Sequence, residues 1–99
     1  MQIKAMSAVA LAAALVSGSA TAGTGYGQIA FINQTSKAGD LYHNDAYGCY
    51  AQAGMVCMTN VRPGIYVVEA RYRDGEIVQG ANPIEVVEGQ VSNFTVTEG

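Results

Sequence analysis

The sequence has 99 residues, of which 49% are hydrophobic and 13% are charged, and its formal net charge is −3. This length allows one small domain. The five Lys and Arg residues are scattered along the chain, whereas nucleic-acid binding depends on clustered cations that displace counterions from phosphates. We therefore predict that nucleic acid is not a partner.

The first 22 residues have the pattern of a cleavable export signal. Lys4 supplies an early positive charge, residues 5–16 are apolar apart from Ser7, and Ala20-Thr21-Ala22 has the small-x-small pattern that signal peptidases read. An apolar run of about 12 residues is too short for a transmembrane helix, which needs roughly 20. Position 23 is Gly and not Cys, so a lipid anchor is not expected. We predict cleavage after Ala22 and a periplasmic or secreted product without a stable membrane anchor.

The remaining chain consists of short apolar runs separated by turn residues, and no stretch keeps helical apolar spacing. Alternation is clearest in 64–73, where one set of side chains is apolar or aromatic and the other carries the charges. Ile29 and Phe31 are expected to face a core together, and so are Phe94 and Val96. The expected strands are, in chain order, 28–33, 40–43, 46–51, 55–61, 64–73, 84–88 and 91–97.

About seven short strands at spacings near ten residues are typical of an all-β fold, and we predict a small antiparallel β-sandwich. The chain is expected to divide into an export signal at 1–22, a flexible mature N-terminus at 23–27 and the sandwich domain at 28–99. A domain of this size has a marginal hydrophobic core, so it is expected to carry a covalent staple.

Two cysteines, Cys49 and Cys57, are placed to form that staple. If Gln52-Ala53-Gly54 forms a three-residue hairpin loop with Gly54 in the left-handed conformation, the two cysteines face each other. Facing residues have Cα atoms roughly 4.5 Å apart, a separation that a disulfide tolerates. Export would place the cysteines in an oxidising compartment. We predict a Cys49–Cys57 disulfide.

The same region offers an alternative, a metal site. His43, Cys49 and Cys57, with the thioethers of Met55 and Met58, include the soft ligands that copper(I) or zinc prefers. The sequence has no CxxC motif and no second histidine, and oxidation would compete for the thiolates. We expect no cofactor and no metal, and we keep these residues as the alternative.

No catalytic residues are predicted. Hydrolysis needs a nucleophile with a base, a carboxylate pair or a bound metal. His43 has no GxSxG serine near it, and the two cysteines are expected to bond to each other. We predict that the protein is not an enzyme.

Tyrosines cluster around the cysteine hairpin, at positions 42, 47 and 50. Exposed, they would make a recognition patch, because Tyr combines rigid apolar area with a hydrogen-bonding tip. Buried, they would supply core volume in a chain with no Trp and two Phe. We take as the predicted binding residues Tyr47, Tyr50, Gln52 and Met55.

The residues between 41 and 75 resemble the PEGA domain. The segment Leu41-Tyr42-His43-Asn44-Asp45-Ala46-Tyr47-Gly48 is similar to the hairpin of that family, and residues 61–70, with Pro63-Gly64, are similar to its Pro-Gly strand, which Asp74-Gly75 follows. The resemblance covers roughly residues 28–97, and small immunoglobulin-like sandwiches share the Pro-Gly strand. It differs from the family pattern at Ala46 and Ile65. The resemblance implies a small sandwich that acts outside the cytoplasm as an accessory module without catalysis.

Taken together, these features predict a non-enzymatic binding or structural module of the cell envelope that presents a stapled hairpin to a protein or another envelope component. Two alternatives remain open. One is a periplasmic metal-binding protein that uses His43 and the sulfur side chains. The other is a secreted inhibitor or effector whose stapled loop enters a target cleft.

Overall fold

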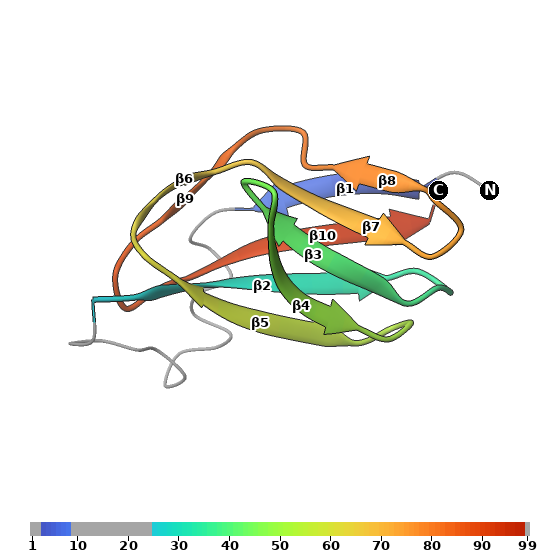
Figure 1. The fold of residues 1–99 in the computed structure, drawn as a ribbon, viewed down its shortest axis with the longest axis horizontal. Coiled ribbons are helices and arrows are strands. Elements are labelled where there is room, and N and C mark those ends of the chain that lie inside the picture. The colour runs from blue at the N-terminus through green and yellow to red at the C-terminus, as the bar shows by residue number, and fades with distance from the viewer. Residues whose placement is uncertain (1–2, 9–24, 99) are drawn as a thin grey trace.

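The computed structural model describes the backbone of residues 3–8 and the backbone and side chains of residues 25–98. The described chain is all-β and forms a sandwich of two four-stranded sheets with a two-stranded sheet at one end (Figure 1). The part described has no helix long and apolar enough to cross a membrane. The strands are β1 (Ile3–Ala8), β2 (Gly27–Gln34), β3 (Gly39–His43), β4 (Ala46–Ala51), β5 (Val56–Val61), β6 (Gly64–Tyr66), β7 (Val68–Tyr72), β8 (Ile77–Gln79), β9 (Ile84–Val86) and β10 (Val91–Glu98).

Sheet I has the strand order β1-β10-β2-β5, and sheet II has the order β4-β3-β7-β8. Strands β6 and β9 form the small third sheet. The pairs among the described strands are antiparallel except β10 and β2, which run parallel. The parallel pair consists of β2 and β10, which are far apart in sequence. No hairpin connects them, so no tight turn forces them to run antiparallel. The predicted sandwich is confirmed.

The core lies between the two large sheets. Ile29, Phe31, Phe94 and Val96 are fully buried, as their alternation predicts, and the rings of Phe31 and Phe94 stack with centroids 5.8 Å apart. Sheet II contributes buried side chains from its central strands. The fully buried members include Ile29, Phe31, Phe94 and Val96 from sheet I, Leu41, Val68 and Ala70 from sheet II, and Ile84 from β9.

The strand predicted over 64–73 is divided in two at Val67. Residues before the break pair with β9, and residues after it pair with β3 and β8. Asn44 holds both backbone groups of Val67: its N–H donates to the Val67 carbonyl at 2.9 Å, and its Oδ1 accepts from the Val67 N–H at 2.8 Å. The strand therefore changes sheets at a position fixed by a turn elsewhere in the chain.

That turn is Asn44-Asp45, which connects β3 to β4. Both residues have positive φ, 48° and 66°, as a two-residue hairpin turn of the primed type requires. Asn and Asp tolerate this conformation better than most residues. The turn lies between the strands expected at 40–43 and 46–51.

Two strands were not expected. The three-residue strand β8 lies between the turn at Asp74-Gly75 and the break at Gly80, and it is too short for an alternation pattern. The other, β1, lies within the predicted export signal and pairs antiparallel with β10. The predicted cleavage position after Ala22 lies outside the described residues. Of the predicted mature N-terminus 23–27, the described part starts at Gly25, and Gly27 is the first residue of β2.

Candidate functional site: a tyrosine face on sheet II

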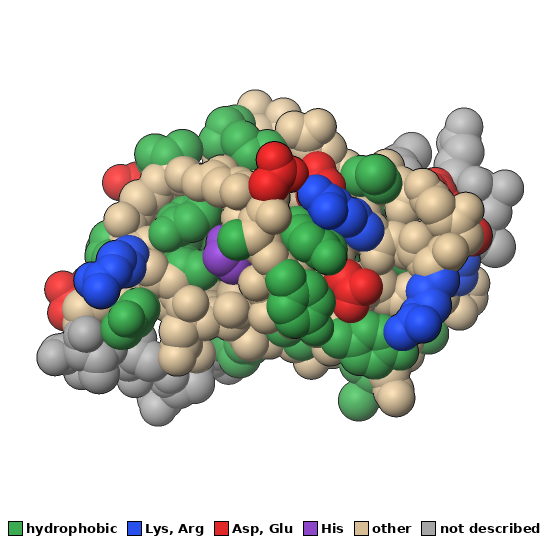
Figure 2. Space-filling model, viewed as in Figure 1, with side chains coloured by type: hydrophobic (Ala, Val, Ile, Leu, Met, Phe, Trp, Pro, Cys, Tyr) green, Lys and Arg blue, Asp and Glu red, His purple; other side chains and the backbone are tan. Residues whose placement is uncertain are grey.

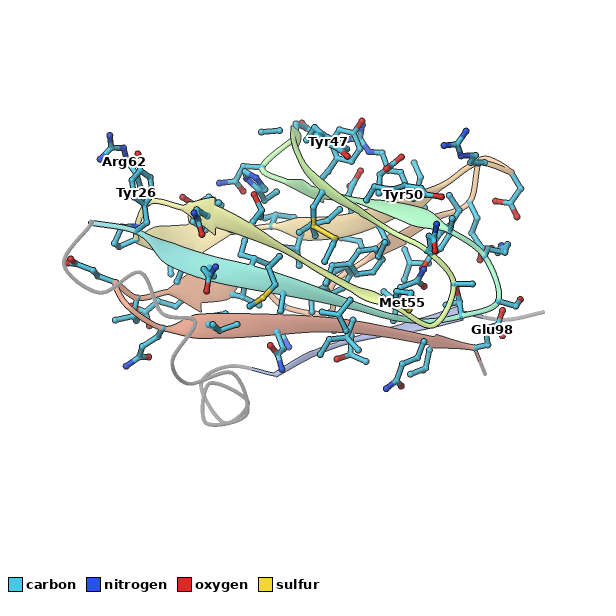
Figure 3. All side chains as sticks on the ribbon, turned by 90° about the horizontal axis from the view of Figure 1, so that it is seen from below. Tyr26, Tyr47, Tyr50, Met55, Arg62 and Glu98 are labelled. Carbon is cyan, nitrogen blue, oxygen red and sulfur yellow. A yellow bond between two sulfur atoms is a disulfide. The ribbon has the colours of Figure 1, made fainter. Side chains whose placement is uncertain are left out.

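The outward face of sheet II carries Tyr42, Tyr47 and Tyr50, and we call this set with Arg71 the tyrosine face. Tyr47 lies opposite Tyr42 on β3, and Tyr50 lies opposite Asp40. Tyr42 follows the fully buried Leu41, so its own side chain points away from the core. Figure 3 shows Tyr47 and Tyr50 projecting from the same side of the sandwich.

A β-bulge explains why the two tyrosines share a face. Side chains alternate along a regular strand, so residues 47 and 50, three positions apart, would point to opposite faces. The register of β3 and β4 shifts between Leu41 and Tyr42, and Gly48 is the extra residue. The insertion of Gly48 returns Tyr47 to the side of Tyr50.

Glycine suits the bulge because space is limited there. A Cβ atom at position 48 would lie 3.1 Å from Cδ2 of His43 and 3.2 Å from both Cδ2 and the carbonyl oxygen of Leu41. These separations are tighter than most van der Waals contacts, so any larger side chain would push on the buried Leu41. The bulge therefore requires a residue without a side chain at position 48.

The tyrosine face is held by aromatic and cationic contacts. The rings of Tyr42 and Tyr47 meet edge to face with centroids 5.7 Å apart. The Arg71 guanidinium lies 3.8 Å from the centroid of the Tyr42 ring, and Arg73 lies 5.9 Å from that of Tyr50. Cation–π contacts of this kind orient the ring as well as attract it. Tyr42 is therefore contacted by Arg71 of β7 and by Tyr47, and Tyr50 by Arg73, which directly follows β7.

Arg71 is itself positioned by two carboxylates. Its Nε donates to Glu69, and its second terminal nitrogen contacts Oδ1 of Asp45 at 3.0 Å. The hydrogen bond to Glu69 raises the pKa of Arg71, so the guanidinium remains charged. Asp45 belongs to the β3–β4 turn, which links the turn to the face.

Cross-strand register arranges the face in two rows that run across sheet II. Each row combines aromatic side chains with charged ones, and Figure 2 shows hydrophobic, acidic and basic side chains lying next to one another over β3, β4 and β7. From β4 to β8 the rows are Tyr47, Tyr42, Glu69, Gln79 and Tyr50, Asp40, Arg71, Ile77.

The structure separates the four predicted binding residues into two places. Tyr47 and Tyr50 are on the tyrosine face and are 57% and 42% exposed. Gln52 and Met55 lie in the turn that follows β4, where the Met55 N–H donates to the Gln52 carbonyl at 3.0 Å. Met55, 56% exposed, is displaced from Tyr47 and Tyr50 in Figure 3.

The sequence did not indicate that Arg71 belongs to this surface. Its outward orientation follows from the alternation of 64–73, but its contact with Tyr42 depends on the pairing of β3 with β7. That pairing joins residues almost thirty positions apart, and no local pattern encodes it.

The Cys49–Cys57 disulfide is present, with Cα atoms 6.0 Å apart. The hairpin geometry predicted for it is wrong. Cys49 is on β4 in sheet II and Cys57 is on β5 in sheet I, so the bond joins the edges of two sheets. Gly54 does take the left-handed conformation, with φ 74°. The staple therefore closes one side of the sandwich.

Contacts from β2 explain why β5 leaves β4. The Asn33 N–H donates to the Met55 carbonyl at 3.0 Å, and β5 then pairs with β2 from Val56 onward. The Asn33 side-chain amide also donates to the carbonyls of Ala51 and Gln52, at 3.1 and 3.2 Å. Both ends of the turn are thus bound to sheet I.

The residues kept as alternative metal ligands, His43, Cys49 and Cys57, do not form a metal site in the described part of the chain. Both cysteine sulfurs are in the disulfide. His43 packs edge-on against Tyr66, with ring centroids 5.6 Å apart, and partial burial lowers its pKa. Met58 follows Cys57 and so points to the opposite face of β5. Within residues 25–98, no cluster of three or more His, Cys, Asp or Glu side chains could hold a metal ion.

Comparisons of the chain with family models, with curated proteins and with solved structures produced no match.

Proposed function

We propose that this chain is an exported, non-enzymatic binding module of the cell envelope, and that its tyrosine face contacts a protein or another envelope component. The observation that carries the proposal is the bulge at Gly48, which places Tyr47 beside Tyr42 and on the same side as Tyr50. A regular strand would have turned one of these two rings toward the core.

The chemistry of the face suits recognition. Tyr and Arg are enriched among the residues that dominate binding energy at interfaces, because they bury large areas and keep polar tips. Here the rings are already oriented by Arg71 and Arg73, so less side-chain entropy is lost when a partner binds. The surface is thus partly preorganised.

The disulfide supports a location outside the cytoplasm. Structural disulfides form and persist in oxidising compartments, and small exported domains use them to supplement a limited core. The leader pattern at 1–22 and the similarity of residues 28–97 to PEGA-like envelope modules favour the same location. We propose processing after Ala22.

The contacts of the two cysteines and of His43 support a binding role over catalysis. The disulfide occupies both thiols, and His43, the one histidine of the sequence, packs against Tyr66. A binding module needs neither a nucleophile nor a base. The function therefore depends on the shape and chemistry of the outer surface.

Crosslinking capture from an envelope extract tests the proposal. The unmodified processed chain, Tyr47→Ala and Tyr50→Ala are each used as bait, and Ile65→Ala serves as the matched control, because its side chain is 62% exposed and β6 belongs to the small third sheet. We expect the two tyrosine variants to lose a crosslinked species that the control retains. Equal crosslinking by all four baits would exclude the tyrosine face as the binding site.

A further inference from the structure

Strand β10 has a neighbour on each side, and the predicted export signal supplies one of them. Residues Ile3–Ala8 of β1 pair antiparallel with Asn93–Glu98 of β10, and β2 pairs parallel with the other side. Figure 1 shows β1 beside β10 and β8 at one side of the sandwich. Removal of residues 1–22 would take β1 away and leave β10 as an edge strand.

The sequence of β10 lacks the features that protect edge strands. Exposed edges usually carry Lys or Pro, a bulge, or very short strands, all of which discourage pairing with another chain. β10 has eight residues, of which Val91–Thr97 lie in an unbroken register with β2, and it contains no Pro, Lys or Arg; its single charge is Glu98 at the end. Its Val, Thr and Phe content favours strand pairing.

Strands β4, β5 and β8, the other edge strands of the two large sheets, are shorter than β10, and each is bulged, very short or followed directly by such residues. Arg62 and Pro63 follow β5 immediately, and β4 is bulged at Gly48. The disulfide also joins β4 to β5. β8 has three residues. The contrast indicates that β10 is built to be covered by another strand.

We propose that in the processed chain the edge of β10 pairs with β10 of a second copy, so that sheet I continues across a two-fold dimer. The proposal rests on the export processing proposed above. The structure already shows that this edge accepts an antiparallel strand over six residues. A second β10 presents the same strand in the same orientation that β1 occupies.

Two-fold pairing of β10 satisfies the chemistry of both faces. Phe94 and Val96 point to the core, whereas Thr95 and Thr97 point outward. In an isologous pair the core-facing side chains of the two copies share one face of the sheet, and the outward side chains share the other. Antiparallel pairing centred in the strand places each Glu98 near the Val91 end of the other copy. The two carboxylates are therefore kept apart.

The test uses the product exported by a bacterial host, with its N-terminus defined by intact mass. Light scattering coupled to size exclusion is then measured on the processed chain, on Thr95→Lys, and on Asn60→Lys as the control. Asn60 is an exposed residue of β5, the opposite edge of sheet I. We expect about twice the single-chain mass for the unmodified chain and the control, and the single-chain mass for Thr95→Lys.

A peptide makes the test independent of the folding of Thr95→Lys. A synthetic peptide with the sequence of residues 3–8, in excess, should halve the mass of the assembly by occupying the β10 edge, and a peptide of reversed sequence should not. A processed chain that stays at single-chain mass up to hundreds of micromolar overturns the proposal and leaves export standing. An exported chain that still begins at Met1 overturns the export step and the dimer together.

Discussion

The hydroxyl of Tyr72 donates a hydrogen bond to Oδ1 of Asn33 across the interior of the sandwich, at 3.1 Å. Tyr72 belongs to sheet II and Asn33 to sheet I, so a buried polar contact joins the two layers. The same Oδ1 accepts from Thr35 Oγ1 at 2.7 Å, and the Asn33 amide donates to the carbonyls of Lys37, Ala51 and Gln52. Asn33 is fully buried, yet its polar atoms are satisfied.

We predict that Asn33→Ala lowers the free energy of unfolding by about 2–4 kcal/mol, because it removes the buried amide that donates to the Ala51 carbonyl and accepts from the Tyr72 hydroxyl. Tyr72→Phe removes one hydrogen bond of the same network and should cost only about 1 kcal/mol. Urea denaturation with the disulfide intact measures both variants. Equal losses in the two variants would contradict a central role for the Asn33 amide.

The disulfide should contribute about 2.5 kcal/mol through the short loop that it closes, on the chain-entropy model. We expect the double variant Cys49→Ser/Cys57→Ser, and the reduced protein, to unfold at a lower urea concentration with β structure retained in water. Intact mass should show the oxidised chain about 2 Da lighter than the reduced chain and without reaction with a thiol reagent. Equal stability with and without reductant would show that the bond between the sheets is not needed.

Local patterns in the sequence predict most strand positions and the disulfide, but they do not predict which sheet a strand joins. Cys49 and Cys57 are close in sequence, so a simple hairpin satisfies their spacing. The observed pairing of β5 with β2 depends instead on contacts of Asn33, which is more than twenty residues away from Val56. Such non-local pairing is decided by the whole fold.

The tyrosine face shows the same limit on a smaller scale. Strict alternation predicts opposite orientations for Tyr47 and Tyr50, and the bulge that aligns them leaves Gly48 as its only trace in the sequence. The pattern of residues 64–73 also does not predict the break at Val67, because the residue that binds Val67 is Asn44, in a turn elsewhere in the chain. Predictions of a face are therefore weakest where a strand carries a glycine or crosses between sheets.

Gly48→Val should destabilise the domain by about 1–3 kcal/mol, because its added carbons would meet Leu41 and His43 in a packed region. Gly54→Ala is the control: it also adds a Cβ, but into open space, and its cost comes from the positive φ of 74°. We expect Gly48→Val to weaken capture of the partner, and Gly54→Ala to leave it unchanged. Thermal unfolding and the crosslinking assay measure the two effects.

Arg71→Lys keeps the charge but loses the planar group that lies on Tyr42. Because the contact is partly exposed, we expect the loss of stability to be small. Partner capture should fall if ring orientation matters, whereas Arg62→Lys, which alters a similar contact on Tyr26 at the other end of the molecule (Figure 3), should leave it intact. Loss of capture in both variants would point to a general effect of charge.

Acid should weaken the attachment of the β10 end to the turn after β2. The backbone and hydroxyl of Ser36 both donate to Oε2 of Glu98, at 3.0 and 2.7 Å, and these hydrogen bonds hold the pKa of Glu98 below its ordinary value of 4.5. A carboxyl with a lowered folded-state pKa adds stability above its unfolded pKa and loses it as the pH falls through the folded one. We therefore expect the urea midpoint to decrease as the pH is lowered below 4.5, and to decrease less steeply in Glu98→Gln than in the unmodified chain. Glu85→Gln, on the exposed side of β9, is the matched control and should keep the original slope; identical slopes in all three proteins would show that Ser36 does not perturb Glu98.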